Sequence, residues 1–333
     1  MRVLVTGGCG YVGSHAVRAL TAGGHDAVIY DNLSTGHRRF SDGYRLIEAD
    51  IADESTLALA LVDVDAVMHF AASAYVGESV TYPRKYFRNN VEAGLQLLDA
   101  VLASKVRLFI FSSSCATYGI PRELPVGESN PREPINPYGA TKLFFEQALA
   151  AYHNSHGLRS VSLRYFNAAG AQADGTIGEL HIPETHLIPL TLQAALETAP
   201  PLMVFGKNLA TPDGTCVRDF VHVSDLAEAH VLALEYLANG GETSTLNLGT
   251  GKGTSVAEVI AAVEQVSKLK VPCSYADPRP GDPPLLYANT ARAKEVLGWQ
   301  AKRDLNEIIR SAWKWELKLK AADYKLEMIS PRP

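Results

Sequence analysis

The sequence is poor in cysteine, in long apolar runs and in excess charge of either sign. Its four cysteines, Cys9, Cys115, Cys216 and Cys273, form no CxxC pair and no Cys/His ligand spacing. We therefore expect no metal site and no redox pair, and free thiols in a reducing cytoplasm. The net charge of -5 provides no broad basic field for phosphate backbones, so nucleic acid is not expected as a partner.

Long hydrophobic stretches are also missing. The run LALALV at 57–62 is among the longest, and Asp63 and Asp65 interrupt it far short of the ~20 residues that a membrane helix needs. The amino terminus, MRVLVTGG, reaches glycine too early for the apolar stretch of a secretory signal. The sequence predicts neither a membrane partner nor export.

The pattern of the first half predicts an α/β fold. Hydrophobic residues make up 47% of 333 residues and charged residues 20%, as in ordinary globular proteins of about two domains. Short β-branched or aromatic runs alternate with helical patterns up to about residue 165: VLV, AVIY, YRLIEAD, AVMHF, LFIF and SVSLRYF. This alternation predicts a doubly wound parallel sheet, whose ligands bind at the carboxyl ends of the strands.

The second half of the chain has a different sequence pattern, with more loops. Gly/Pro-rich loops after residue 166 are typical of a region that covers a substrate. An amphipathic helix is expected up to Gly240 and Gly241, followed by a buried strand, TLNLGTG. The next helix is expected to start with a capping box of Ser255 and Glu258. We expect residues of about 218–250 to rejoin the first sheet.

A glycine-rich segment, TGGCGYVGSH, follows the first predicted strand. Gly7, Gly10 and Gly13 are spaced by three, and Gly8 also completes a GxGxxG pattern. Such glycines permit a tight turn, close approach of the backbone to a pyrophosphate, and close packing of a helix whose amino terminus favours the anion. The alternative is a plain turn, but the strand-to-helix context favours a dinucleotide site.

An acidic residue, Asp31, ends the second predicted strand, where a ribose hydroxyl would be recognised. Its charge would repel a 2′-phosphate, so NAD is favoured over NADP. The nearby Arg38 and Arg39 keep that choice open.

Tyr138 and Lys142 form a YxxxK pattern in a segment with helical periodicity, so their side chains should share one helix face. A tyrosine with an ordinary pKa near ~10 is a poor base at pH 7, and a neighbouring ammonium and a cationic nicotinamide would both favour the phenolate. Taken alone, the pair could equally lie on a helix surface. Ser112, Ser113 and Ser114 end the LFIF strand and provide either a turn or a hydroxyl that contacts the substrate.

Several motifs in this order resemble the extended short-chain dehydrogenase/reductase family, and within it the branch of nucleotide-sugar 4-epimerases. They extend over about residues 2–300: TGGCGYVGSH, HFAA, FSSSCATYG, NPYGATK, RYFNAAG, GTCVRDFVHVSDLA and NLGTGKG. The resemblance implies a Rossmann NAD-binding domain at 1–165, rejoined by about 218–250, and a smaller mixed α/β domain at 166–333 that binds the nucleotide sugar, the two being interleaved.

The resemblance also implies the chemistry. Tyr138 would take the proton of the sugar 4-hydroxyl, Lys142 would assist it and contact the nicotinamide ribose, and Ser114 would hydrogen-bond to the substrate. Hydride would pass from C4 to NAD and return to the other face of a 4-keto sugar, which interconverts UDP-glucose and UDP-galactose. The implied cofactor residues are Gly7, Gly10, Tyr11, Val12, Gly13, Asp31, Asn32, Asp50, Ile51, Phe70, Ala71, Asn89, Ser112, Tyr138, Lys142 and Tyr165. The implied substrate residues are Ser114, Tyr138, Asn167, His186, Leu187, Val204, Phe205, Arg218, Arg279, Asp282 and Leu286.

Three positions depart from the family pattern. Ala74 stands where many members have a lysine that contacts the cofactor, and His186 stands where some have asparagine. Leu286 occupies the position that helps to choose between plain and N-acetylated hexoses, and its intermediate size leaves UDP-GlcNAc and UDP-GalNAc open.

Other functions remain as alternatives. UDP-xylose/UDP-arabinose or UDP-glucuronate epimerisation would use the same catalytic set, and a non-catalytic NAD-sensing protein would need no Tyr138 or Lys142. Dehydratases and decarboxylases of the family need acidic residues after the strand-end serine, where this chain has Cys115 and Ala116. By resemblance, a homodimer is expected through the helices at 86–101 and after Pro137.

Overall fold

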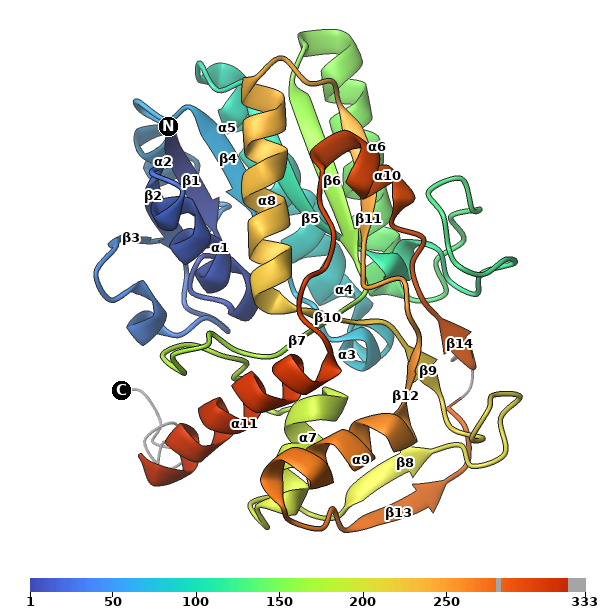
Figure 1. The fold of residues 1–333 in the computed structure, drawn as a ribbon. Coiled ribbons are helices and arrows are strands. Elements are labelled where there is room, and N and C mark those ends of the chain that lie inside the picture. The colour runs from blue at the N-terminus through green and yellow to red at the C-terminus, as the bar shows by residue number, and fades with distance from the viewer. Residues whose placement is uncertain (280–282, 323–333) are drawn as a thin grey trace.

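The computed structural model describes residues 1–279 and 283–322. Its centre is a parallel sheet with the strand order β11-β6-β5-β4-β1-β2-β3 (Figure 1). Its strands are β1 (Arg2–Thr6), β2 (Asp26–Asp31), β3 (Arg45–Glu48), β4 (Ala66–His69), β5 (Leu108–Ser114), β6 (Arg159–Tyr165) and β11 (Ser244–Leu248). The order reverses between β1 and β4, and ligands of such sheets bind at this reversal, beyond the carboxyl ends of the strands.

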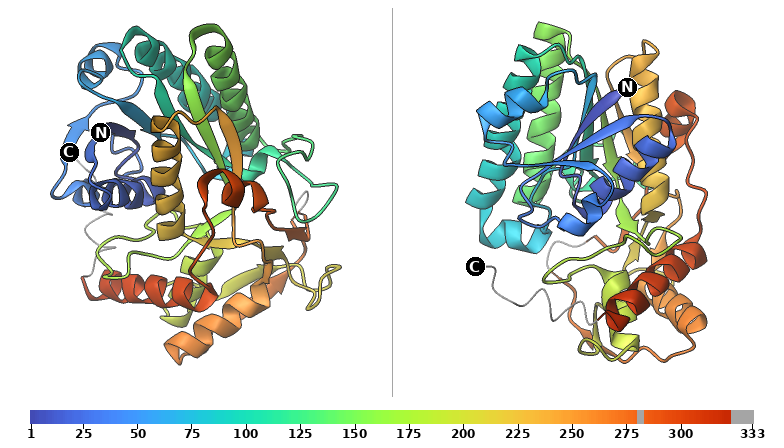
Figure 2. Two further views of the ribbon diagram at one scale, coloured as in Figure 1. Left: turned by 45° about the horizontal axis from the view of Figure 1, so that its top comes forward. Right: turned by 90° about the vertical axis from the view of Figure 1, so that its left-hand side faces the viewer.

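Both faces of the sheet are covered by helices, as the right-hand view in Figure 2 shows. Side chains alternate along each strand, so Val3 and Val5 face one helical layer and Leu4 faces the other. The first layer consists of α1 (Tyr11–Ala22), α8 (Val223–Ala238) and α10 (Ala291–Leu297). The second layer consists of α2 (Glu54–Ala60), α5 (Ala93–Ala103) and α6 (Pro137–His156). The predicted doubly wound α/β fold is confirmed.

The second half of the chain returns to this sheet. Strand β11 pairs in parallel with β6, and α8 packs beside α1. The division of the chain into domains at residue 165 stays a prediction.

The remainder of the second half forms a smaller unit below the carboxyl ends of the strands (Figure 1). Its own core lies among α7 (Leu187–Ala195), α9 (Val256–Ser267), α11 (Leu305–Ala321) and strand β8 (Leu202–Phe205). The short strands here are β7 (Asn167–Ala169), β9 (Val217–Arg218), β10 (Phe220–His222), β12 (Thr254–Ser255), β13 (Cys273–Ala276) and β14 (Leu285–Leu286). Loops between the sheet and this unit therefore face the strand ends.

Local signals define the helix ends. Asn136 caps α6 by accepting a hydrogen bond from the Gly139 amide, and Gly157 ends the helix with a φ of 71°. The predicted capping box of Ser255 and Glu258 is present at the start of α9. The remaining helical segments are α3 (Val76–Thr81), α4 (Pro83–Tyr86), a π-helical segment (Phe87–Glu92) and two 3₁₀ turns (Arg38–Ser41 and Cys115–Thr117).

Within the described residues, no helix is both long and apolar enough to cross a membrane. The cytoplasmic location stays a prediction.

A core truncation tests the sheet packing. Leu163 of β6 is fully buried, so Leu163→Ala should lower the free energy of unfolding by about 2–5 kcal/mol. The control is Leu59→Ala in α2, where Leu59 is 76% exposed and the change should stay within about 0.5 kcal/mol. Urea denaturation measures both, and an equal loss in the two variants would contradict the packing described here.

Candidate functional site

The end of strand β5 and the start of helix α6 bring four predicted residues together. Lys142 Nζ donates a hydrogen bond to the Ser112 carbonyl oxygen at 2.7 Å and lies 5.8 Å from the centre of the Tyr138 ring. The Ser114 side chain is hydrogen-bonded to Tyr138. The strand thus positions its serines beside the face of α6 that carries the tyrosine and the lysine.

Burial controls the ionisation of this cluster. It raises the pKa of Tyr138 well above the ordinary value, while the hydrogen bond with Ser114 acts in the opposite direction. Burial also lowers the pKa of Lys142 to about 7, although the negative charge of the Glu146 carboxylate acts to raise it. Tyr138 is therefore protonated near pH 7 unless a further positive charge is placed beside it.

A buried polar network lies directly behind these residues. Glu146 receives hydrogen bonds from the Ser113 hydroxyl at 2.5 Å and from Arg164 Nε and Nη2 at 2.8 and 2.5 Å. Arg164 Nη1 also donates to the Tyr118 hydroxyl at 2.8 Å, which in turn donates to Asn247 Oδ1 at 2.7 Å. This charge-assisted pair anchors α6 to strands β5 and β6.

The sequence analysis missed Glu146 and Arg164. The available signal was the spacing of four residues from Lys142 to Glu146, which places both on one face of α6.

The glycine segment forms the turn from β1 into α1. Gly7 has a φ of 75°, and a Cβ there would lie 2.5 Å from the Ala71 backbone nitrogen. A Cβ on Gly13 would lie 2.2 Å from the Gly7 carbonyl oxygen. Gly10 caps α1, whose first turn holds Tyr11 and Val12 and carries no acidic side chain. The open amides of this helix end suit an anion such as a pyrophosphate.

Asp31 lies beside this turn, at the end of β2. Its buried carboxylate accepts hydrogen bonds from the Cys9 amide at 2.9 Å and the Leu33 amide at 2.8 Å. Burial raises the pKa of Asp31, and these two amides act against that rise. The carboxylate is thus fixed in place at the strand end.

The next strand contributes a second pair. Asn32 donates to Asp50 Oδ2 at 2.7 Å, which joins the ends of β2 and β3, and Ile51 is buried beside them. These residues extend the predicted adenosine end of the site.

The loop after β4 completes this edge. The ring of Phe70 packs 4.7 Å from that of His230, and the adjacent Ala71 contacts the glycine turn. Asn89 belongs to the π-helical segment and donates to Asn90 Oδ1 at 3.0 Å. Asn90, which the sequence analysis missed, is buried and hydrogen-bonded to both the amide and the carbonyl of Ser73. Segments of this kind are frequent at functional sites.

On the sheet side, the hydroxyl of Tyr165 lies 2.8 Å from Ser112 Oγ. On the far side, Arg218 of β9 pairs with Leu286 of β14, and Arg218 Nη1 donates to the Pro283 carbonyl at 2.8 Å. Arg279 lies over the Phe205 ring at 4.0 Å. The charge of Arg218 acts on the Cys115 thiol, which follows Ser114, so this region faces the catalytic cluster.

The other predicted substrate residues lie around this region. The amide of Asn167 donates to the Asp219 carbonyl at 2.9 Å, and Leu187 opens α7. The Val204 side chain is buried in the core of the smaller unit. Asp282 lies outside the described residues.

Asp219 is a further residue that sequence reasoning missed, although it belongs to the VRDF motif. It is fully buried and accepts hydrogen bonds from the amides of Thr250, Gly251 and Ala288 at 2.7–3.1 Å. Burial raises its pKa, while these hydrogen bonds lower it. The carboxylate thereby ties the loop after β11 to the segment after β14 and fixes the strand that carries Arg218.

His186 lies in a loop with two carboxylates. Its Nδ1 lies 2.6 Å from Glu179 Oε1 and 3.3 Å from Glu184 Oε1. Burial alone would lower the pKa of His186, but these carboxylates outweigh it and raise the pKa to about 10. The imidazole is therefore a cation near pH 7.

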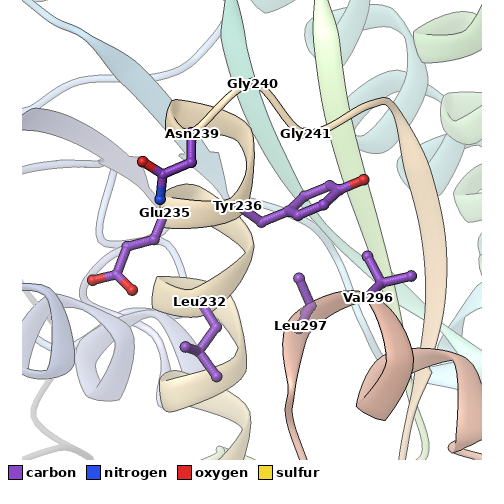
Figure 3. A pocket seen from close by; sticks show the side chains of 8 residues that line it. All are labelled: Leu232, Glu235, Tyr236, Asn239, Gly240, Gly241, Val296 and Leu297. Atoms are coloured by element: carbon purple, nitrogen blue, oxygen red, sulfur yellow. The ribbon is translucent and has the colours of Figure 1, made fainter.

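A separate surface hollow lies between the ends of α8 and α10, at the amino ends of the strands and thus away from these residues (Figure 3). It is lined by Leu232, Glu235, Tyr236, Asn239, Gly240, Gly241, Val296 and Leu297. Of these only Glu235 is charged, and no predicted site residue lies there.

Residues 3–249 match the model of the NAD dependent epimerase/dehydratase family. The chain belongs to this family. A curated relative, the UDP-glucose 4-epimerase of Rhizobium leguminosarum bv. trifolii, is 51% identical over 318 residues, which are 95% of this chain and 97% of that protein.

Solved structures extend the comparison. The UDP-glucose 4-epimerase from Brucella ovis in complex with NAD superposes with a TM-score of 0.92 at 50% identity, over 94% of this chain and 97% of that one. The enzyme from Stenotrophomonas maltophila, with bound NAD and formylated UDP-arabinopyranose, gives 0.94 at 41% identity, over 97% and 99%. The resemblance drawn from the sequence motifs is confirmed.

The shifted ionisation of Lys142 predicts a pH effect on stability. Its pKa falls from 10.5 to about 7 on folding, so the unfolded chain binds more protons between these values. The stability of the wild type relative to Lys142→Met should therefore rise with pH in this interval, by at most ~1.4 kcal/mol per unit.

Urea denaturation at pH 7, 8 and 9 measures this difference. Lys105→Met, at an exposed position after α5, is the matched control and should run parallel to the wild type. A constant difference between wild type and Lys142→Met across this range would contradict the lowered pKa of Lys142.

Proposed function

We propose that this chain interconverts UDP-glucose and UDP-galactose by oxidising and re-reducing C4 of the sugar, with NAD as the cofactor. The observation that carries this function is the placement of Ser114, Tyr138 and Lys142 at the end of β5, on the same sheet edge as the glycine turn after β1. Family membership and the names of relatives that cover 95% of the chain support the same reaction.

The residues around the glycine turn fit NAD. Gly7 and Gly13 leave no room for a Cβ, the end of α1 offers amides to the pyrophosphate, and Asp31 lies where a ribose hydroxyl would be accepted. Bound NAD would accept hydride from C4, return it to the opposite face of the sugar, and place a positive charge near Tyr138.

Proton transfer is the task of the chain itself. Tyr138 Oη takes the proton of the 4-hydroxyl as C4 loses hydride, which leaves a 4-keto sugar, and it returns the proton when C4 is reduced again. Ser114 hydrogen-bonds to Tyr138 and can also contact the sugar oxygen, and Lys142 adds charge from the next helix turn. No proton is consumed over a cycle.

Residues of the smaller unit would hold the UDP moiety. Arg218 and Arg279 are permanent cations suited to a diphosphate. Leu286 pairs with Arg218 and would lie on the sugar side. Binding by the diphosphate leaves the sugar ring free to present either face of C4 to the cofactor.

The direct test is incubation of the purified chain with UDP-galactose and, in parallel, with UDP-glucose, followed by chromatography. Both mixtures should converge on one ratio without net formation of NADH. Conversion of only a pentose, a uronate or an N-acetylhexosamine would reassign the sugar, and conversion of none of these UDP-sugars with NAD supplied would reject the function.

The proton-transfer role predicts the behaviour of Tyr138→Phe. This variant should keep its affinity for NAD and UDP, because the ring and its packing remain, but lose about 10²–10⁴-fold in turnover. Calorimetry measures binding and the chromatographic assay measures turnover. Full activity in the variant would rule out Tyr138 as the base.

We also propose that the chain forms a homodimer through α5, α6 and the adjoining π-helical segment. Phe87 and Phe144 lie on these elements and are 45% and 44% exposed, so they offer apolar surface that a second copy could cover. Phe144→Asp should shift the protein to a monomer in light scattering, whereas Leu317→Asp, at an exposed position on α11, should not. A monomeric wild type would refute the interface.

A further inference from the structure

Four side chains that can ligate a metal meet in the loop before α7. The sequence analysis expected no metal site because the cysteines show no ligand spacing. This 179–186 cluster contains no cysteine, so that argument does not apply to it. One ligand atom from each side chain lies within 4.8 Å of the others. The cluster consists of Glu179, His181, Glu184 and His186.

The distances within the cluster suit a common central ion. His181 Nδ1 lies 3.2 Å from Glu179 and 3.8 Å from Glu184, and His186 Nδ1 lies 2.6 and 3.3 Å from the same two carboxylates. A tetrahedral ion with bonds of ~2.0–2.1 Å separates its ligands by about 3.3 Å. Small movements of side chains would reach that geometry.

Two atoms of the cluster form ion pairs only with other members of the cluster. Glu179 is 6% exposed, and its Oε1 lies 2.6 Å from His186 Nδ1 and 3.2 Å from His181 Nδ1. Neither Glu179 Oε1 nor His181 Nδ1 makes a contact with hydrogen-bond geometry. The backbone here is itself fixed, because the Glu179 carbonyl accepts from Trp315 Nε1 at 2.7 Å. These atoms thus face one another as the ligands of a common ion would.

We propose that the 179–186 cluster binds a divalent transition-metal cation, with Zn²⁺ as the first candidate. Two imidazole nitrogens and two carboxylate oxygens form a ligand set that zinc accepts, whereas Ca²⁺ and Mg²⁺ prefer six or more oxygens. Four protein ligands close the coordination sphere, so the ion has a structural role.

The position of the cluster defines that role. The His181 ring packs 6.2 Å from the ring of Tyr11 in the glycine turn and 5.6 Å from that of Tyr75. The Tyr11 hydroxyl also donates to the Gly170 carbonyl at 2.6 Å. The ion would fix the loop before α7 against the turn that begins α1, whichever nucleotide sugar is the substrate.

The test uses the full chain, dialysed against EDTA and then titrated with ZnCl₂ and, separately, with CoCl₂. Plasma mass spectrometry should find one Zn²⁺ per chain after gel filtration, and Co²⁺ should give the intense visible absorption of a tetrahedral site. Zinc should also raise the melting temperature, since it binds only the folded loop.

Variants locate the ion. His181→Gln should weaken Zn²⁺ binding at least ~100-fold. His25→Gln should not, because His25 forms a similar contact with Glu235 (3.7 Å) outside the cluster. Cys273→Ser, which removes an exposed thiol, should also leave zinc binding unchanged. If circular dichroism shows that His181→Gln does not fold, Glu184→Gln replaces it.

Three results would overturn the proposal. These are a wild type that retains no zinc after gel filtration, equal zinc affinity in the wild type and the folded cluster variant, and loss of the zinc in Cys273→Ser.

Discussion

The buried ion pair between Glu146 and Arg164 holds the helix on which the proposed chemistry depends. Tyr138, Lys142 and Glu146 follow one another at intervals of four residues, so they occupy one face of α6. Glu146 fixes this face to Ser113 and Arg164 of the two central strands. Because an unpaired charge at this depth is very unfavourable, any shift of the helix that separated the pair would be strongly destabilising. The position of Tyr138 over the strand ends follows from it.

A second buried carboxylate, that of Asp219, fixes the segments on the substrate side of the site. Asp219 gathers the amides of Thr250, Gly251 and Ala288, which belong to segments far apart in the sequence. The adjacent Arg218 is thereby held close to the end of β5. The catalytic and nucleotide sides of the site thus each rest on an acidic residue that touches no reacting atom, and both depend on the parallel sheet that brings the strand ends to one edge.

The sheet, helix α6 and the glycine turn could be predicted from the sequence because each is determined by residues close together in the chain. Apolar runs, the spacing from Tyr138 to Lys142 and the need for Gly7 at a positive φ are all visible within a few residues. Glu146, Asp219 and the 179–186 cluster were not reached, since their importance comes from partners brought together by the fold. A charged residue inside an apolar pattern has no recognisable role until its partner strand is known.

The return of the chain to its first sheet affects the order in which the protein can form during synthesis. Strands β1 to β6 are complete at Tyr165, but the edge of β6 stays unpaired until β11, Ser244–Leu248, has been made. Helix α8, which covers Val161 and Leu163, also arrives late. The nascent chain therefore carries an open strand edge and an uncovered apolar face through much of translation, which is the period in which it is most exposed to aggregation and most in need of chaperones.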